Sequence, residues 1–398
     1  MYKKILAYVS TMVLCFGGFI YFQSYDFFNQ EIAFAEDIEE NQYSGSCGEN
    51  ATYSFDDTTG TLTISGTGNM KEYPDFILKP WDNYKLKITS IVIEDGITSI
   101  SRIAFENCTS LESIYIPNSV TEIGYGAFKN CISLESISIP NGVTKINDCI
   151  FQKCISLKSV IIPNSVTEIN YSAFENCTSL ESIIIPNSVT KIDYGAFENC
   201  TSLESIDIPN SVTTIGYGVF KGCTSLKSLT IPQSVTNFGG GIFDCTSLES
   251  LVFEEGITEI SGDGICKNCP NLTNVIIPES AISISRGFYD CTSLKNVYIP
   301  KNIQVISEYA FYNNSDDFTI TGYSGTIAEI YAKQKGYNFI SIGDNELNLK
   351  YLDNGLAYYI NDENTITIYN YTYGDLAEII IPETIDNLPV TKIAEDCF

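Results

Sequence analysis

The sequence contains no histidine among its 398 residues. Histidine is the commonest general base and the commonest metal-binding side chain, so its absence excludes His-dependent catalytic triads and His-zinc centres. Basic residues are also scarce: 22 Lys and Arg stand against 49 Asp and Glu, which gives a net charge of −27. A surface of this charge repels phosphate backbones, so we predict that the protein does not bind nucleic acid.

Charged residues make up only 18% of the chain, whereas apolar residues make up 44%. A chain of this composition is too hydrophobic to be disordered, and we expect it to fold. The N-terminus is typical of an export signal, because Lys3 and Lys4 precede an uncharged run over residues 5–22 and Ala33-Phe34-Ala35 offers a small-x-small cleavage site. We predict a signal peptide over residues 1–35 and a secreted or cell-surface location; the alternative is a retained anchor.

An internal repeat of about 23 residues runs through the chain. Six cysteines follow each other at intervals of 23 residues, and three more continue at intervals of 22, 24 and 22: Cys108, Cys131, Cys154, Cys177, Cys200, Cys223, Cys245, Cys269 and Cys291. One unit, residues 111–133, reads LESIYIPNSVTEIGYGAFKNCIS. In a short strand its fourth and sixth residues point inward and the fifth points outward. Because one coil cannot bury its apolar positions alone, we predict a solenoid of about ten stacked coils.

The unit resembles the BspA-like, or Treponema-type, leucine-rich repeat, Leu-x-x-Ile-x-Ile-Pro-x-x-Val-x-x-Ile-x-x-x-Ala-Phe-x-x-Cys-x-x, over residues 88–313. The resemblance implies a leucine-rich-repeat solenoid that is mainly β, with short irregular or 3-10 segments and a parallel β strip on the inner face. It also implies that residues 36–87 open the array as an N-terminal capping module and that residues 314–343, with a short helix, close it. The sequence departs from the pattern where Phe253-Glu254-Glu255 replaces Ile-Pro-x, and the units holding Gly240, Gly264 and Phe288 break the Ala-Phe rule.

The C-terminal part of the sequence begins another unit of the same kind at residues 376–398. We predict that residues 344–398 are the start of a second repeat array that is cut short. The alternative is that this last element packs elsewhere.

The cysteines suggest either a metal site or a structural column. A zinc site needs four ligands that converge, whereas one cysteine per coil forms a line along the solenoid, so we predict buried structural thiols and no metal. Cys149 and Cys266 lie off this line, and we expect them to be the more reactive thiols. Cys266-Lys267-Asn268-Cys269 also forms a lone C-x-x-C.

Carboxylates are numerous, but their placement follows the repeat. The second position of the unit forms one column and the twelfth another: Glu112, Glu135, Lys158, Glu181, Glu204, Lys227 and Glu249, and Glu122, Lys145, Glu168 and Lys191. These are solvent-facing columns in which neighbouring coils pair opposite charges. Since no two carboxylates stand apart as an acid and a base, we predict no catalytic residues, no cofactor and no small-molecule substrate.

The fifth position varies while the rest of the unit is nearly constant, and we predict that it binds a partner: Tyr115, Ser138, Ile161, Ile184, Asp207, Thr230, Val252, Ile276 and Tyr298. Exposed apolar side chains in this column form a strip of the kind that marks interaction surfaces, although β-branched residues also simply suit strands. An alternative aromatic stripe consists of Tyr125, Tyr171, Tyr194 and Tyr217. Tyrosine is enriched at interfaces, but these rings are equally compatible with a packed stack.

These observations predict a non-catalytic protein that presents an extended binding surface. The resemblance implies adhesion, with host matrix proteins, other cell-surface proteins or a surface glycan as partner. One alternative is a targeting module of a larger surface enzyme whose catalytic domain lies outside this chain. The other is a structural spacer of the cell envelope.

Overall fold

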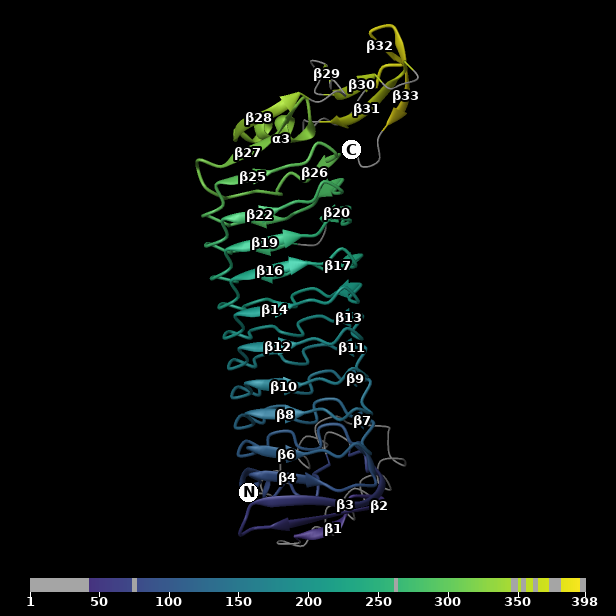
Figure 1. Cartoon of the computed structure of the whole chain (residues 1–398), viewed down its shortest axis with the longest axis vertical. Coiled ribbons are helices and arrows are strands. Elements are labelled where there is room, and N and C mark those ends of the chain that lie inside the picture. Colours follow the sequence, from purple (N-terminus) through teal and green to yellow (C-terminus); the bar gives the residue numbers. More distant parts are fainter. Residues whose placement is uncertain are drawn as a thin grey trace, which may run out of the picture.

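The computed structural model describes residues 43–73, 77–260, 264–344, 350–351, 356–360, 364–371 and 381–393. The predicted signal peptide lies outside these residues. The described chain forms a mainly β solenoid of parallel coils with one α-helix near its C-terminal end (Figure 1). The predicted fold class, a leucine-rich-repeat solenoid, is confirmed.

One side of the stack, here called the strand face, consists of twelve parallel strands within the described residues (Figure 1). Ten of them fall within residues 88–313. They are β4 (Ser90–Ile93), β6 (Ser113–Tyr115), β8 (Ser136–Ser138), β10 (Ser159–Ile161), β12 (Ser182–Ile184), β14 (Ser205–Asp207), β16 (Ser228–Ile231), β19 (Ser250–Phe253), β22 (Asn274–Ile276), β25 (Asn296–Tyr298), β27 (Thr319–Ser324) and β28 (Asn338–Asp344).

A second column of short strands follows the turn after the strand-face strand of each coil, which reads Pro-Asn-Ser in four of them. It consists of β5 (Ile97–Ile100), β7 (Glu122–Ile123), β9 (Lys145–Ile146), β11 (Glu168–Ile169), β13 (Lys191–Ile192), β15 (Thr214–Ile215), β17 (Asn237–Phe238), β20 (Glu259–Ile260), β23 (Ser283–Ile284) and β26 (Val305–Ile306). The third side carries only β18 (Ile242–Phe243), β21 (Cys266–Lys267) and β24 (Phe288–Tyr289) among the described residues. Elsewhere on this side the backbone still bonds between coils, since the N–H of Phe128 donates to the carbonyl of Ile150 at 3.0 Å.

Left-handed residues turn the chain sharply on this third side. The residue before the column cysteine has a positive φ in most coils, for example 60° at Asn130 and 58° at Asn199. Asparagine tolerates this conformation better than other non-glycine residues. The same side chain also joins neighbouring coils, because the amide of Asn130 donates to that of Asn107 at 2.7 Å. The repeated asparagine therefore serves both the turn and the stacking.

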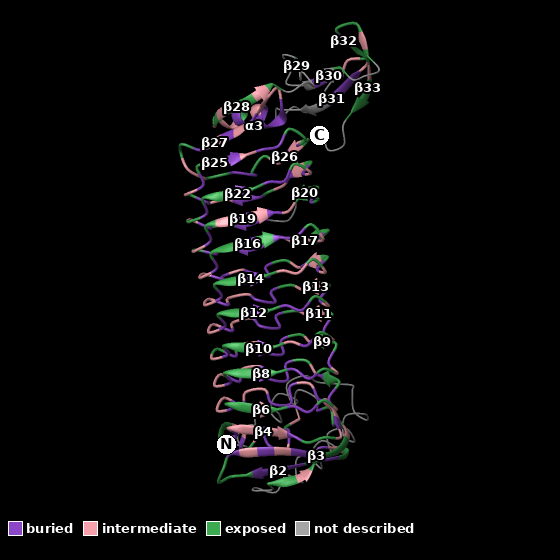
Figure 2. Cartoon of the chain, in the orientation of Figure 1, coloured by how far each residue is buried: buried purple, intermediate pink, exposed green. Residues whose placement is uncertain are grey.

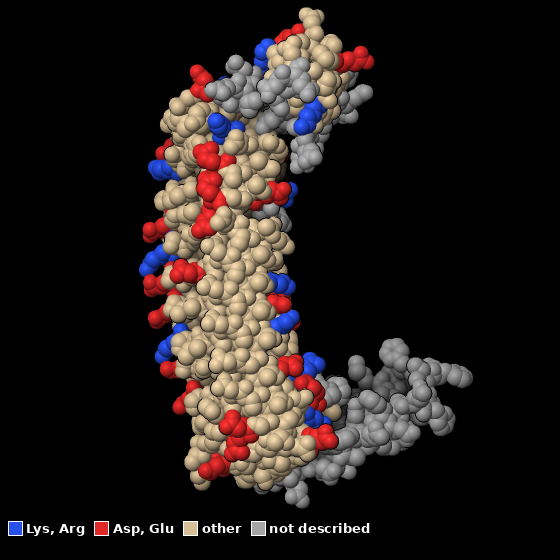
Figure 3. Space-filling view, turned by 45° about the vertical axis from the view of Figure 1, so that its right-hand side comes forward, with Lys and Arg blue, Asp and Glu red and all other residues tan. Residues whose placement is uncertain are grey.

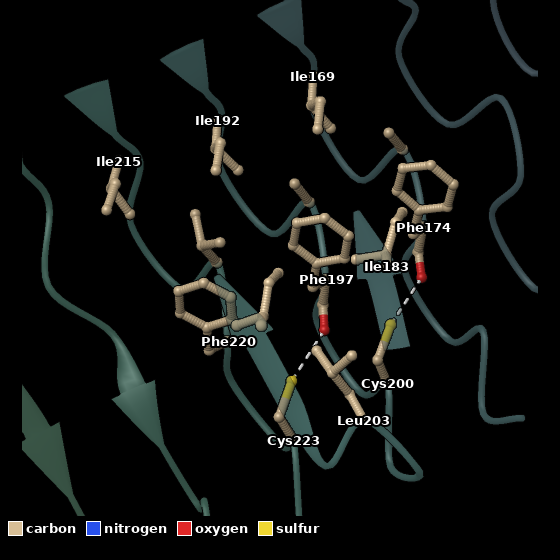
Figure 4. Close-up of a cluster of buried hydrophobic side chains, with 14 of the residues drawn as sticks. Ile169, Phe174, Ile183, Ile192, Phe197, Cys200, Leu203, Ile215, Phe220 and Cys223 are labelled. Carbon is tan, nitrogen blue, oxygen red and sulfur yellow. Dashed lines mark hydrogen bonds between the residues drawn. The ribbon is translucent and has the colours of Figure 1, made fainter. Parts of the chain in front are cut away.

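The core confirms the predicted orientation of the strand residues. Each three-residue strand from β8 to β14 is exposed, buried and exposed in turn (Figure 2). Beneath the strands the phenylalanines of successive coils stack from Phe105 to Phe220, and Figure 4 shows the last three of these rings. The rings of Phe174 and Phe197 lie 5.4 Å apart and nearly parallel, and Phe197 and Phe220 follow at 6.1 Å. Parallel register brings identical side chains together in successive coils, and this produces the stack.

The column cysteines are buried, as predicted, and they also join the coils. The Sγ of Cys200 donates to the carbonyl of Phe174, and the Sγ of Cys223 donates to that of Phe197, both at 3.2 Å (Figure 4). Each bond is a second one to its carbonyl, because the carbonyls of Phe174 and Phe197 also accept the backbone N–H groups of Cys177 at 3.1 Å and Cys200 at 3.2 Å. The cysteine column is therefore a set of weak donors as well as small apolar side chains.

The expectation that Cys149 and Cys266 are the reactive thiols is wrong, because both side chains are buried. Burial raises the pKa of both thiols and so disfavours the nucleophilic thiolate. Cys149 occupies a left-handed turn position, with φ of 54°, and its side chain is covered to 4% exposure. Cys266 pairs in register with Ile242 and Phe288, so it takes the place of a stacked phenylalanine.

Separate structures cover the two ends of the coil stack. At the N-terminal end, β1 (Ser44–Ser46), β2 (Gly48–Asp56) and β3 (Thr61–Met70) form an antiparallel meander, and β3 pairs in parallel with β4. After the 3-10 helix η1 (Lys85–Lys87) the coils begin; Trp81 is buried here, and its Nε1 donates to the carbonyl of Ala104 at 2.8 Å. At the other end, the helix α3 (Ile327–Lys335) lies between β27 and β28 and ends at the left-handed Gly336.

The described C-terminal strands have their own small core of Tyr358, Ile366, Ile368 and Ile385. They are β29 (Lys350–Tyr351), β30 (Leu356–Ile360), β31 (Ile366–Tyr371), β32 (Thr384–Ile385) and β33 (Leu388–Ile393). Strands β29, β30 and β31 form an antiparallel meander, and β31 pairs in parallel with β33. This connectivity matches that of β1 to β4. It supports our proposal that residues 344–398 start a second array.

Candidate binding surface

The fifth-position residues lie on the strand face, where the second residue of each strand is buried and the third points away from the core. Ile184 is 85% exposed and Ile161 is 66% exposed, and Tyr115 and Ile276 are also exposed. Ser138, Asp207 and Thr230 are exposed as well, whereas Val252 and Tyr298 are half-buried. Ile161 and Ile184 lie in adjacent coils and form an apolar patch, and contiguous patches rather than single exposed residues mark interaction surfaces.

A band without charge extends from this column toward the second strand column. In six successive coils the seven residues from the fifth position onward are uncharged except for Asp207: 115–121, 138–144, 161–167, 184–190, 207–213 and 230–236. Several of the hydroxyls here are committed to the fold, since Ser188 Oγ donates to the carbonyl of Val166 at 2.6 Å and Ser211 Oγ to that of Val189 at 2.7 Å. The band is therefore a regular, ordered surface.

Charged side chains gather along the edges of this uncharged surface (Figure 3). On one edge Lys158 pairs with Glu135 at 3.1 Å and Lys227 with Glu204 at 2.9 Å. On the other, Lys145 pairs with Glu168 at 3.0 Å. The predicted pairing of opposite charges between coils is confirmed. Exposed pairs of this kind add little stability, so the edges chiefly set the charge pattern around the band.

A polar hollow of about 240 Å³ interrupts the strand face between β14 and β16. It is lined by Ser205, Ile206, Asp207, Ile208, Ser228, Thr230, Pro232 and Glu254. The hydrogen-bonded ladder is broken at this point, because β14 pairs with β12 and β16 pairs with β19. Sequence reasoning missed this hollow. Its one signal was that Asp207 is the single charge in the band.

The alternative aromatic stripe is a stack of half-exposed rings. Tyr171 and Tyr194 lie 5.4 Å apart at 18°, and Tyr194 and Tyr217 lie 5.7 Å apart at 26°. Tyr125 stands apart from them, with the guanidinium of Arg102 at 5.7 Å from its ring. The structure thus brings three of the four tyrosines together.

Within the described residues there is no group of three or more His, Cys, Asp or Glu side chains that could hold a metal ion. In the same part of the chain, no helix has the length and apolar character that a membrane crossing requires.

Comparisons with known proteins identify the repeat. The profile of the BspA type leucine-rich repeat region matches in six copies across residues 82–204, 190–317 and 259–333. Similar solved structures include a leucine-rich repeat protein from Bacteroides ovatus, 23% identical over 74% of this chain and 99% of that one, with a TM-score of 0.41. A leucine-rich cell surface protein from Faecalibacterium prausnitzii is 25% identical over 71% and 89%, with a TM-score of 0.36. The leucine-rich repeat protein of T. pallidum is 24% identical over 63% and 91%, with a TM-score of 0.32. No curated protein matches the chain.

Proposed function

Because this chain belongs to the family of BspA type leucine-rich repeats, we propose that it is a secreted or cell-surface protein that binds another protein through its strand face. The observation that carries the proposal is the pair Ile161 and Ile184, which project from adjacent coils within an uncharged band. Interface cores are depleted of charge, and this band is depleted of charge in a chain whose net charge is −27.

We propose that the protein mediates adhesion and does not catalyse a reaction. Stacked coils form an extended, regular surface, and such surfaces generally serve protein recognition. The variation at the fifth position supports this role, because the buried positions around it are held to fixed sizes by the stack while the fifth position is free to differ. Host matrix proteins and other cell-surface proteins are the partners that we propose.

The test is capture of matrix proteins and bacterial surfaces by the purified full chain. We expect Ile161→Glu with Ile184→Glu to abolish capture, because two charges are placed in an apolar contact, while the free energy of unfolding changes by less than about 0.5 kcal/mol. Ile155→Glu with Ile282→Glu is the matched control, since these isoleucines are exposed outside the fifth-position column. The control variant should bind like the unaltered chain.

Two outcomes would overturn the proposal. If capture survives the paired change at Ile161 and Ile184 but is lost when Tyr171, Tyr194 and Tyr217 are replaced, the partner docks on the tyrosine stripe. If the full chain captures neither matrix proteins nor bacterial surfaces, the protein is a structural spacer and not an adhesin. Export is tested separately by mass spectrometry of the protein from the cell surface and medium, where a mature chain that begins at Glu36 is expected.

A further inference from the structure

The single charge in the uncharged band lies inside the polar hollow. Asp207 is the last residue of β14, and its carboxylate is exposed on the strand face. Among the described residues no side chain or backbone group forms an ion pair or hydrogen bond with this carboxylate. An exposed carboxylate that the protein leaves unpaired beside an apolar patch is available to a partner.

A second carboxylate lines the same hollow and is held in place. Glu254 accepts a hydrogen bond from the backbone N–H of Gln233 at 3.1 Å. No lysine or arginine is among the residues that line the hollow. Lys227, which adjoins the lining residue Ser228, is engaged with Glu204 at 2.9 Å. The hollow therefore carries two negative charges and three hydroxyls, with no cation in its lining.

The acidic hollow is directly continuous with the apolar patch. Ile184 and Asp207 are register partners in the parallel pair β12 and β14, and neighbouring strands lie about 4.8 Å apart. A partner that covers Ile184 therefore places its adjacent side chain over Asp207. The net charge of −27 favours the approach of a cationic partner over a neutral one.

We propose that the hollow between β14 and β16 receives a lysine or arginine side chain of the bound protein, while a neighbouring apolar side chain of that protein packs on Ile184. This inference rests on the proposed function and names the chemistry of the partner. A guanidinium or ammonium group matches the hollow because its donors have two carboxylates and the hydroxyls of Ser205, Ser228 and Thr230 as acceptors. The recognition element is thus a cation beside an apolar residue.

The experiment uses small probes, so that it does not depend on a known partner. N-acetyl-arginine amide is titrated into the deuterated full chain and followed by the NMR signals of Asp207, Ile208 and Thr230. N-acetyl-citrulline amide, which has nearly the same shape without the charge, is the paired probe. We expect saturable shifts at these three residues with the arginine probe and none with the citrulline probe.

Two double variants locate the effect. Asp207→Asn with Glu254→Gln should weaken binding of the arginine probe by about tenfold or more, which corresponds to about 1.4 kcal/mol. Glu112→Gln with Glu181→Gln removes the same charge from the exposed edge column and should leave binding within about twofold, since these groups are outside the hollow. Equal losses in the two variants, or equal shifts along all acidic columns, would show non-specific attraction and overturn the inference.

The same materials separate this inference from the proposed function. Ile184→Ser keeps the hollow and should retain probe binding while it loses protein capture. If the probe fails to bind in the hollow although the strand face still captures a protein, the cation inference is wrong and the adhesion proposal stands. If the probe binds but no protein is captured, the adhesion proposal is wrong.

Discussion

Phe253 and Cys266 depart from the repeat within one coil, and we predict that each compensates for the other. Most coils place a phenylalanine where Cys266 lies, as at Phe220 and Phe288, although the coil directly before has Ile242 there. Phe253 stands where other coils have isoleucine, is 2% exposed, and has its ring 6.4 Å from that of Phe288. The ring of Phe253 thus reaches toward the ring column and fills part of the space that the small side chain of Cys266 leaves there.

The perturbation is therefore a double-mutant cycle of Phe253→Ile and Cys266→Phe. The first change leaves a cavity and should cost about 1–3 kcal/mol, less than the 3–5 kcal/mol of a full Phe→Ala truncation. The second forces a ring into a packed core and should cost about 1–3 kcal/mol. In the double variant the new ring fills the new cavity, so the cost should fall below the sum by about 0.5–3 kcal/mol.

The assay is urea unfolding of the full chain, monitored by circular dichroism. The dependence of the unfolding free energy on urea concentration is compared among all four proteins. Phe128→Ile with Cys266→Phe serves as the control cycle, because Phe128 stacks with Phe105 and Phe151 in distant coils and should not couple. Additivity within about 0.5 kcal/mol for the Phe253 cycle would refute the compensation.

Two further predictions concern the stack. Phe197→Ala, in the middle of the ring column, should cost about 3–5 kcal/mol and lower the urea midpoint far more than Ile184→Ala, whose side chain is exposed; equal effects would show that the stack adds nothing. Burial raises the pKa of the Cys154 and Cys200 thiols from 9.0 to about 12, so their stabilising contribution is complete below about pH 9 and is lost as the pH rises toward 12. Urea midpoints should therefore fall above pH 9, and Cys154→Ala with Cys200→Ala should flatten that dependence; an unchanged slope would contradict the assignment.

The coil core could be predicted because its positions are constrained by stacking. Ile137 and Ile139 had to point inward once the exposed Ser136 and Ser138 were placed in a strand, since adjacent strand residues alternate and neighbouring coils repeat the pattern. The cysteine column followed from its spacing alone. The hydrogen bond from the Cys200 thiol to the carbonyl of Phe174 could not be predicted, because it depends on how two neighbouring coils are placed relative to each other.

Compensation between two positions of one coil could not be predicted by considering each position of the repeat alone. Cys266 departs from the spacing of the column cysteines and was for that reason judged reactive, whereas the register with Ile242 and Phe288 places it in the ring column. The hollow beside Asp207 likewise depends on several coils at once, because Asp207, Thr230 and Glu254 of three successive coils all line it.

The geometry of the tyrosine stripe bears on which surface binds and what it binds. In the stack of Tyr171, Tyr194 and Tyr217, each ring face lies against the next ring at 5.4–5.7 Å. Ring edges, hydroxyls and the outer face of Tyr171 are then left for a partner, whereas packing of a sugar along the stripe needs open faces on several rings. The stripe is thus poorly suited to grip a glycan. Ile161 and Ile184 have no such neighbour above them and present their whole side chains, and this favours the strand face as the surface and a protein as the partner.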